Sequence, residues 1–305
     1  MPKFHGVIPP VVVPLTTSYE VDYPSYTRVL EHLIGAGVHG LFVLGSTSEV
    51  VFHDEATRRR IIEHSVTVAN GRLPVLAGVI DPATERVIGH AKAAKAAGAA
   101  ALVVTAPFYA RTSMPEIEDH FRYVRDAVDL PVVAYDIPVC VHSKLDRAMV
   151  VRLAREGVIA GLKDSSGDDG NFRYVLNDLK DRPDVFLMTG SEIVVDSVLA
   201  MGAHGVVPGL GNVDPAGYVR LWDAAQRGDW GVAKAEQERL CRLFEIVWQG
   251  VPRTSAGASG VGGFKTAMRR LGIIATNLMA RPQRALNDEE AARIDVILRA
   301  AGLLA

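Results

Sequence analysis

The chain has 305 residues, of which 49% are hydrophobic and 22% are charged, a balance typical of a folded globular protein rather than a disordered one. A formal net charge of −2 and a pI near 6.5 argue against a nucleic-acid-binding protein, which usually carries excess basic residues. No apolar run reaches about 18 residues, so we expect no membrane span, and the first residues lack the apolar core of a signal peptide. The two cysteines, Cys140 and Cys241, fit neither a disulfide framework nor a metal-ligand spacing, which predicts a reduced, cytoplasmic protein.

Short apolar runs rich in Val, Ile and Leu alternate along the chain with longer segments of helical periodicity. The runs predict eight buried strands, at residues 6–13, 40–45, 73–80, 101–106, 131–137, 158–163, 185–190 and 205–209. The other segments predict eight helices, at residues 23–36, 53–69, 84–97, 115–128, 146–156, 170–180, 192–201 and 214–226. Because strands that alternate with helices usually pair in parallel, these units predict an α/β fold, a (β/α)8 TIM barrel.

No strand is predicted after the eighth helix. We expect residues 1–229 to form the barrel and residues 230–305 to form a C-terminal helical extension of the same domain. The periodicity of this extension predicts helices at residues 231–248, 263–271 and 288–301. The Gly- and Ser-rich segment 250–263 is interpreted as a flexible connector.

Active sites of (β/α)8 barrels lie at the C-terminal ends of the strands, so the residues at these ends are the functional candidates. The sixth predicted strand ends at Lys163, and the other seven lysines fall on predicted helices, loops or termini. A buried ammonium is costly unless it is paired or loses its proton, and a neutral amine can attack a carbonyl to form a Schiff base. The alternative is a structural lysine that pairs with a carboxylate such as Asp164.

Hydroxyl groups are found at two other strand ends. Tyr135 ends the fifth strand, where its phenol could relay a proton; the alternative is a structural aromatic residue with a satisfied hydroxyl. The turn after the second strand presents Ser46 and Thr47 together with free backbone N–H groups, an arrangement that suits a carboxylate but also occurs in ordinary turns.

The turns after the seventh and eighth strands are glycine-rich and contain Gly190 and Gly209. Phosphate-binding barrels place their anion site at these turns, so a phosphate-recognising enzyme is an open alternative. The nine histidines show no metal-ligand spacing, and we therefore expect no catalytic metal.

Three segments, 45–49, 135–138 and 161–164, together resemble the dihydrodipicolinate synthase / N-acetylneuraminate lyase family of class I aldolases. The resemblance covers nearly the whole chain. It implies a lyase that needs no bound cofactor, because Lys163 forms a Schiff base with the substrate pyruvate. It also implies that Tyr135 relays protons and that Ser46 and Thr47 hold the pyruvate carboxylate.

Further roles follow from the same resemblance. Thr47 is expected to link Tyr135 to Tyr109, and Tyr109 is expected to reach the site of a neighbouring subunit in a homotetramer built as a dimer of dimers. Val207 matches a position in the eighth strand whose backbone carbonyl lies near the lysine. The pocket for the second substrate is expected to include Gly190, Ser191 and Glu192, whose small polar groups suit a hydroxylated chain.

Two positions depart from the family pattern. Ser48 replaces a glycine of the turn, which implies backbone strain if that position has positive φ. Cys140 stands where dihydrodipicolinate synthases carry an arginine that binds the carboxylate of the second substrate, and a thiol cannot make that bidentate contact. Arg111 or Lys144 could substitute for it.

Cys140 argues against dihydrodipicolinate synthesis, and the Ser46-Thr47 and Lys163-Asp164 pairs look more like the sugar-acid members of the family. The resemblance therefore favours cleavage or dehydration of a 2-keto-3-deoxy sugar acid or a related 4-hydroxy-2-keto acid, with pyruvate as the common part. Dihydrodipicolinate synthesis from pyruvate and aspartate semialdehyde is the first alternative. A phosphate-recognising barrel enzyme and a non-catalytic keto-acid sensor are the others.

Overall fold

The structure is a computed structural model that describes residues 4–305. Residues 1–3, with which the predicted absence of a signal peptide begins, lie outside the described residues. Its centre is one sheet of eight parallel strands in the spatial order β1-β8-β7-β6-β5-β4-β3-β2. The strands are β1 Gly6–Val7, β2 Leu41–Val43, β3 Val75–Gly78, β4 Ala101–Thr105, β5 Val132–Asp136, β6 Gly161–Asp164, β7 Phe186–Thr189 and β8 Gly205–Val206. Every strand residue is buried, as expected of a parallel sheet covered by helices, and the predicted α/β class with eight parallel strands is confirmed.

The two edges of this sheet approach each other beside β1. The Phe42 N–H donates to the Pro9 carbonyl (3.0 Å), and the Val11 N–H donates to the Phe42 carbonyl (2.8 Å), which forms a parallel bridge between Pro10 and Phe42. The strand predicted at residues 6–13 is shorter in the structure because two successive prolines have no N–H to donate to a ladder. The strand predicted at residues 205–209 is also shorter, since Pro208 follows its end.

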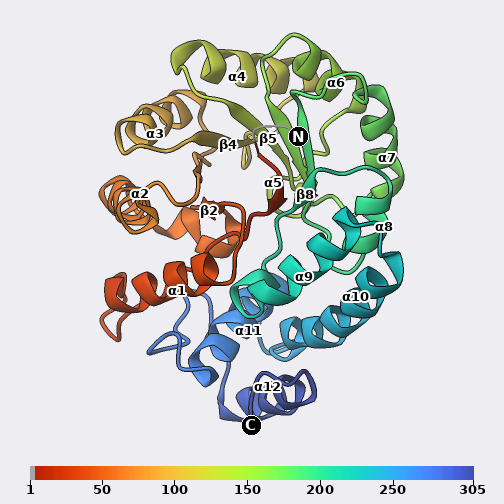
Figure 1. Ribbon diagram of the computed structural model, residues 1–305. Coiled ribbons are helices and arrows are strands. Elements are labelled where there is room, and N and C mark those ends of the chain that lie inside the picture. Colours follow the sequence, from red (N-terminus) through yellow and green to blue (C-terminus); the bar gives the residue numbers. More distant parts are fainter. Residues whose placement is uncertain (1–3) are drawn as a thin grey trace.

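Helices connect and surround the strands (Figure 1): α1 Tyr23–Gly35, α2 Glu55–Ala69, α3 Thr84–Ala96, α4 Met114–Ala127, α5 Pro138–Val141, α6 Arg147–Arg155, α7 Asp169–Asp178, α8 Val195–Ala200 and α9 Pro215–Gln226. Aspartates cap five of them by accepting a hydrogen bond from a backbone N–H of the first turn; these are Asp22, Asp54, Asp146, Asp168 and Asp214. The sequence prediction missed α5. It also began the helix at residues 192–201 too early, because Glu192 turns back toward the loop after β8.

Three helices and a short 3-10 segment follow α9: α10 Trp230–Phe244, η4 Glu245–Trp248, α11 Ala256–Arg270 and α12 Asp288–Ala300. In Figure 1, α10 and α12 lie outside the helices that surround the sheet, and α11 lies between α1 and α9. Helix α10 packs on α8 and α9, and α11 packs on η4 and α12. The prediction of a flexible connector at residues 250–263 is wrong, because α11 begins at Ala256. A Cβ added at Gly263 would lie 2.5 Å from the Ile246 carbonyl oxygen, so this glycine serves close packing rather than flexibility.

The register of the sheet sets which side chains meet at its C-terminal rim. Thr105 of β4 lies opposite Tyr135 of β5, and Tyr135 lies opposite Lys163 of β6. Since successive residues of a strand point to opposite faces, Asp136 and Asp164 point away from the face that carries Tyr135 and Lys163. None of the helices described over residues 4–305 combines the length and the apolar character needed to cross a membrane.

Candidate active site at the C-terminal ends of the strands

Lys163 is 5% exposed, and its Nζ lies 4.0 Å from the ring centroid of Tyr135 and 4.8 Å from that of Phe42. The electron-rich ring faces attract a cation but do not neutralise it. Within residues 4–305, no carboxylate forms an ion pair with Lys163. The alternative of a structural pair with Asp164 is therefore wrong.

Asp164 has other partners. Its Oδ1 accepts hydrogen bonds from the N–H (2.8 Å) and the hydroxyl (2.7 Å) of Ser166. Its Oδ2 lies 3.8 Å from the ammonium of Lys144, which also pairs with Asp136. Lys144 thus neutralises the outward-facing carboxylates of β5 and β6, and among the described residues Lys163, on the other face of β6, forms no ion pair with either of them.

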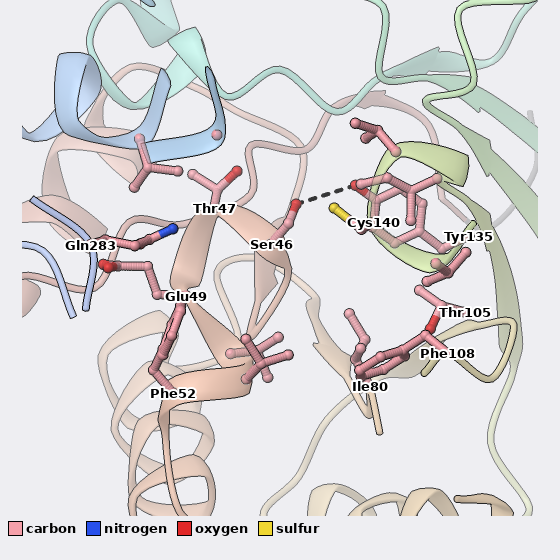
Figure 2. Close-up of a pocket in the computed structure, with 17 residues that line it drawn as sticks. Ser46, Thr47, Glu49, Phe52, Ile80, Thr105, Phe108, Tyr135, Cys140 and Gln283 are labelled. Carbon is pink, nitrogen blue, oxygen red and sulfur yellow. Dashed lines mark hydrogen bonds between the residues drawn. The ribbon is translucent and has the colours of Figure 1, made fainter. Parts of the chain in front are cut away.

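Tyr135 is joined to Ser46 by a hydrogen bond of 3.4 Å between the two hydroxyl oxygens (Figure 2). Ser46 and Thr47 belong to η1 Ser46–Ser48, which follows β2. We expected Thr47 to contact Tyr135 and Tyr109, but the structure places Ser46 on the Tyr135 hydroxyl. Tyr109 is 97% exposed, so a single chain does not bring it to the other site candidates.

The backbone strain that the sequence suggested at Ser48 is not present in the turn that carries these hydroxyls. Ser48 does not have positive φ, and its hydroxyl donates a 2.6 Å hydrogen bond to the Val11 carbonyl. The left-handed residue is instead Glu49, with φ 56° and ψ 37°. The next segment, η2 Val50–Phe52, continues from it.

Glu49 forms a buried ion pair with Lys265 of α11, and sequence reasoning missed both residues. The Lys265 side chain is fully buried and also donates to the Leu278 carbonyl (2.9 Å), while Glu49 accepts from the Ala280 N–H (2.7 Å). Burial lowers the pKa of Lys265, and the Glu49 carboxylate opposes that effect. The pair connects the turn that carries Ser46 and Thr47 to the C-terminal helix α11. Its two residues are 216 positions apart in the sequence, so no local sequence pattern can predict the contact.

The end of β7 lies directly beside Lys163. A Cβ added at Gly190 would lie 2.0 Å from the Ser165 hydroxyl oxygen and 3.3 Å from Lys163 Cε, so a larger residue there would require the Ser165 hydroxyl to rotate and would press on the Lys163 side chain. The Ser191 N–H donates to the Thr189 hydroxyl (2.9 Å). The Val207 N–H donates to the Thr189 carbonyl (2.8 Å), which fixes the end of β8 against β7.

Glu192 is a partly exposed residue whose carboxylate is buried under the loop after β8. It accepts hydrogen bonds from the Leu210 N–H (2.7 Å) and the Tyr218 hydroxyl (3.4 Å). Burial raises the pKa of this carboxyl to about 7. The Leu210 N–H, at the start of η3 Leu210–Asn212, already donates to the Glu192 carboxylate. This donor is therefore not free to bind a phosphate, as the phosphate-binding alternative would require.

A cleft of about 500 Å³ opens at Ser46, Thr47 and Tyr135. Cys140 of α5 lines it beside Tyr135 (Figure 2), and although the residue is exposed, desolvation in the cleft raises the pKa of its thiol. The two basic residues considered as substitutes for the family arginine lie elsewhere. Lys144 pairs with Asp136, and Arg111 donates to the His142 carbonyl (3.3 Å).

Metal ligation has no support in the described part of the chain. Among residues 4–305, no group of three or more His, Cys, Asp or Glu side chains could hold a metal ion. What the rim does offer is a buried amine without an acidic partner, next to a phenol and a serine hydroxyl. A set of this kind suits nucleophilic addition of an amine to a carbonyl, with a hydroxyl pair to move protons.

The comparisons with known proteins agree with this chemistry. The model of the dihydrodipicolinate synthetase family matches residues 3–301. A 4-hydroxy-tetrahydrodipicolinate synthase of Phenylobacterium zucineum is 32% identical over 99% of both chains. A probable 2-dehydro-3-deoxy-D-pentonate aldolase of Escherichia coli is 29% identical, over 100% of this chain and 99% of the other.

Solved structures give the same result. A dihydrodipicolinate synthase of Bacteroides thetaiotaomicron superposes with a TM-score of 0.92 at 31% identity, over 98% of this chain and 99% of the other. A prophage protein of the dihydrodipicolinic acid synthase family from Escherichia coli, solved in complex with pyruvate, has a TM-score of 0.92 at 27% identity over 99% of both chains. The protein is therefore a lyase that belongs to the dihydrodipicolinate synthetase family.

Proposed function

We propose that the protein cleaves a 4-hydroxy-2-keto acid into pyruvate and an aldehyde, with Lys163 as the nucleophile. The observation that carries the proposal is the buried Lys163 ammonium, which lacks a carboxylate partner within residues 4–305 and lies 4.0 Å from the Tyr135 ring centroid. The free amine is the form that attacks a ketone.

The reaction begins when the Lys163 amine adds to the C2 ketone. The Tyr135 phenol donates its proton to the ketone oxygen, which leaves as water, and the resulting iminium accepts electrons. The Tyr135 phenolate then takes the proton of the C4 hydroxyl, the C3–C4 bond breaks, and its electron pair moves to the iminium, which gives an enamine and the free aldehyde. Protonation of C3 and addition of one water then release pyruvate and restore the amine, so that no external oxidant or reductant is needed.

The other rim residues complete the assignment. Ser46 and Thr47 would hold the keto-acid carboxylate through their hydroxyls and backbone N–H groups, since the turn after β2 faces the same cleft. Gly190 leaves room for the Lys163 side chain, and Ser191 and Val207 would border the bound keto acid. We propose no metal and no bound cofactor.

The nature of the second product distinguishes the alternatives. The aldolase relative supports a 2-keto-3-deoxy sugar acid as substrate, and loss of water from the same adduct would make the enzyme a dehydratase. The synthase relative supports condensation of pyruvate with aspartate semialdehyde, against which stands Cys140. A keto-acid sensor would bind pyruvate without any turnover.

We also propose that residues 1–229 form one closed (β/α)8 barrel with residues 230–305 as its helical extension, and that the active form is a homotetramer. The exposed Tyr109 motivates the second point, because a bulky aromatic side chain that is 97% exposed is typical of a contact surface. Light scattering after size exclusion gives the mass, and a monomer at micromolar concentration would remove any role for Tyr109.

Pyruvate release from a panel of 4-hydroxy-2-keto acids tests the proposal. We expect turnover by the native protein and a loss of at least about 10³-fold in kcat/KM for Lys163→Met. The matched control is Lys234→Met, which changes an exposed lysine on α10 and should leave turnover unchanged. Equal rates for Lys163→Met and the native protein would refute the role of this lysine.

A further inference from the structure

The cleft beside Tyr135 has a wall of hydrocarbon side chains. Phe52 of η2, Ile80 after β3, Phe108 after β4 and Val139 of α5 all line it, and Figure 2 shows the first three along its lower edge in that view. Val139 is 80% exposed and Phe52 is 41% exposed, so the wall extends to solvent, where a substrate enters. Exposed apolar side chains grouped at a concave site are typical of a ligand-binding surface.

Charged groups on a substrate find no partner along this wall. None of the described residues that line the cleft is a lysine, arginine or histidine. The single carboxylate, that of Glu49, is already paired with Lys265. The thiol of Cys140 is neutral at neutral pH, because desolvation raises its pKa.

Uncharged polar groups find few partners. Ser46, Thr47 and Tyr135 are needed for the keto acid itself. Two further oxygens in the cleft, Thr105 Oγ1 and Gln283 Oε1, are buried without a hydrogen-bond partner within residues 4–305. They can partner two polar groups, one of which is the C4 hydroxyl that the reaction requires. The further hydroxyls of a sugar-acid chain would lie against these hydrocarbon side chains, which offer them no hydrogen-bond partner, and this is unfavourable.

Resting on the function proposed above, we propose that the group attached to C4 of the substrate is apolar, an aromatic ring or a branched alkyl group. The aldehyde product is then an aromatic or branched aliphatic aldehyde rather than a sugar. The cleft of about 500 Å³ beside Tyr135 is large enough for such a group. This substrate class differs from the sugar acid that the small polar residues after β7 suggested, because the residues that line the cleft come mainly from the loops after β2, β3, β4 and β5.

The test compares 4-hydroxy-2-oxo-4-phenylbutanoate with 2-dehydro-3-deoxy-D-pentonate as substrates for the native protein. Pyruvate release gives kcat/KM for each, and we expect the phenyl compound to be favoured at least about tenfold. Equal preference, a preference for the pentonate, or no cleavage of the phenyl compound overturns the inference.

A second measurement separates this inference from the function on which it rests. Pyruvate alone in D₂O exchanges its methyl protons for deuterium if Lys163 forms the enamine, whatever the second substrate is. Exchange together with a preference for the pentonate refutes only the apolar substrate class. Absence of catalysed exchange refutes the Schiff-base function, and the inference with it.

A matched pair of variants links the preference to the wall. Val139→Asn places an amide in the cleft, whereas Val296→Asn makes the same change at a 64% exposed valine of α12. We expect Val139→Asn to lower the ratio of the two kcat/KM values about tenfold. The ratio should be unchanged in Val296→Asn, and an unchanged ratio in Val139→Asn would show that the wall does not select the substrate.

Discussion

Replacement of Lys265 by methionine tests whether a buried ion pair fixes the turn that carries Ser46. Methionine has a similar volume but no charge. Among the described residues, the buried Glu49 carboxylate would keep the Ala280 N–H (2.7 Å) as its one hydrogen-bond donor, and the Leu278 carbonyl would lose the donor at Lys265. Removal of one partner of a buried ion pair costs about 3–5 kcal/mol. We expect the free energy of unfolding of Lys265→Met to fall by about that amount.

Denaturant unfolding at neutral pH measures the effect against Lys234→Met, since Lys234 forms an exposed pair with Glu238 at 3.7 Å. Exposed pairs contribute at most about 1 kcal/mol, so the control should lose little stability. The double variant Glu49→Leu/Lys265→Met should recover most of the loss, because a buried pair replaced by apolar residues of similar size is often neutral. A loss in Lys265→Met no larger than in Lys234→Met would refute the reasoning.

Three further predictions concern the rim of the sheet. Tyr135→Phe removes only the phenol oxygen and should lower kcat for pyruvate release by about 10²–10⁴-fold, and an unchanged kcat would exclude Tyr135 as the proton carrier. Gly190→Ala places a methyl group 2.0 Å from the Ser165 hydroxyl oxygen and should slow methyl-proton exchange of pyruvate about 10²-fold, whereas Gly89→Ala, which meets no atom within 4 Å, should not. Glu192 has its pKa raised from 4.5 to about 7 by burial, so its stabilising contribution is complete below its unfolded pKa and is lost as pH rises through about 7. Glu192→Gln should therefore gain stability relative to the native protein between about pH 5 and about pH 8 in denaturant unfolding, and a constant difference would contradict the buried carboxylic acid.

The sequence was sufficient to predict the eight strands and the candidate residues at their ends for a physical reason. Parallel strands buried on both faces are continuous apolar runs, so a polar residue at the end of a run stands out. Tyr135 and Lys163 both end such runs, and the structure places them opposite each other on β5 and β6. Because successive side chains of a strand point to opposite faces, Lys163 and Asp164 cannot pair with each other. Composition alone could not exclude that pair.

The errors have equally specific causes. Glycines between 256 and 263 have the composition of a linker, but Gly263 packs against the Ile246 carbonyl inside α11. The ion pair between Glu49 and Lys265 depends on tertiary contact across most of the chain. Which hydroxyl of the turn reaches Tyr135 depends on the backbone of η1, which the sequence pattern does not specify.

The apolar cleft wall was missed for a related reason. Its residues come from several different loops, and each of them singly has an ordinary structural interpretation. Phe108 follows the fourth strand, where an aromatic residue is usually part of the core, and Val139 lies on a one-turn helix that the periodicity did not predict. They form the proposed substrate-binding surface because the fold brings them together in one cleft beside Tyr135.

The central claim is that Lys163 forms a covalent Schiff base, and borohydride reduction in the presence of pyruvate tests it most directly. Peptide mapping by mass spectrometry then identifies the modified lysine. The account predicts one reduced pyruvate adduct per chain, located on Lys163 and absent without pyruvate. An unmodified protein, or an adduct on Lys265, the other buried lysine of residues 4–305, would contradict it.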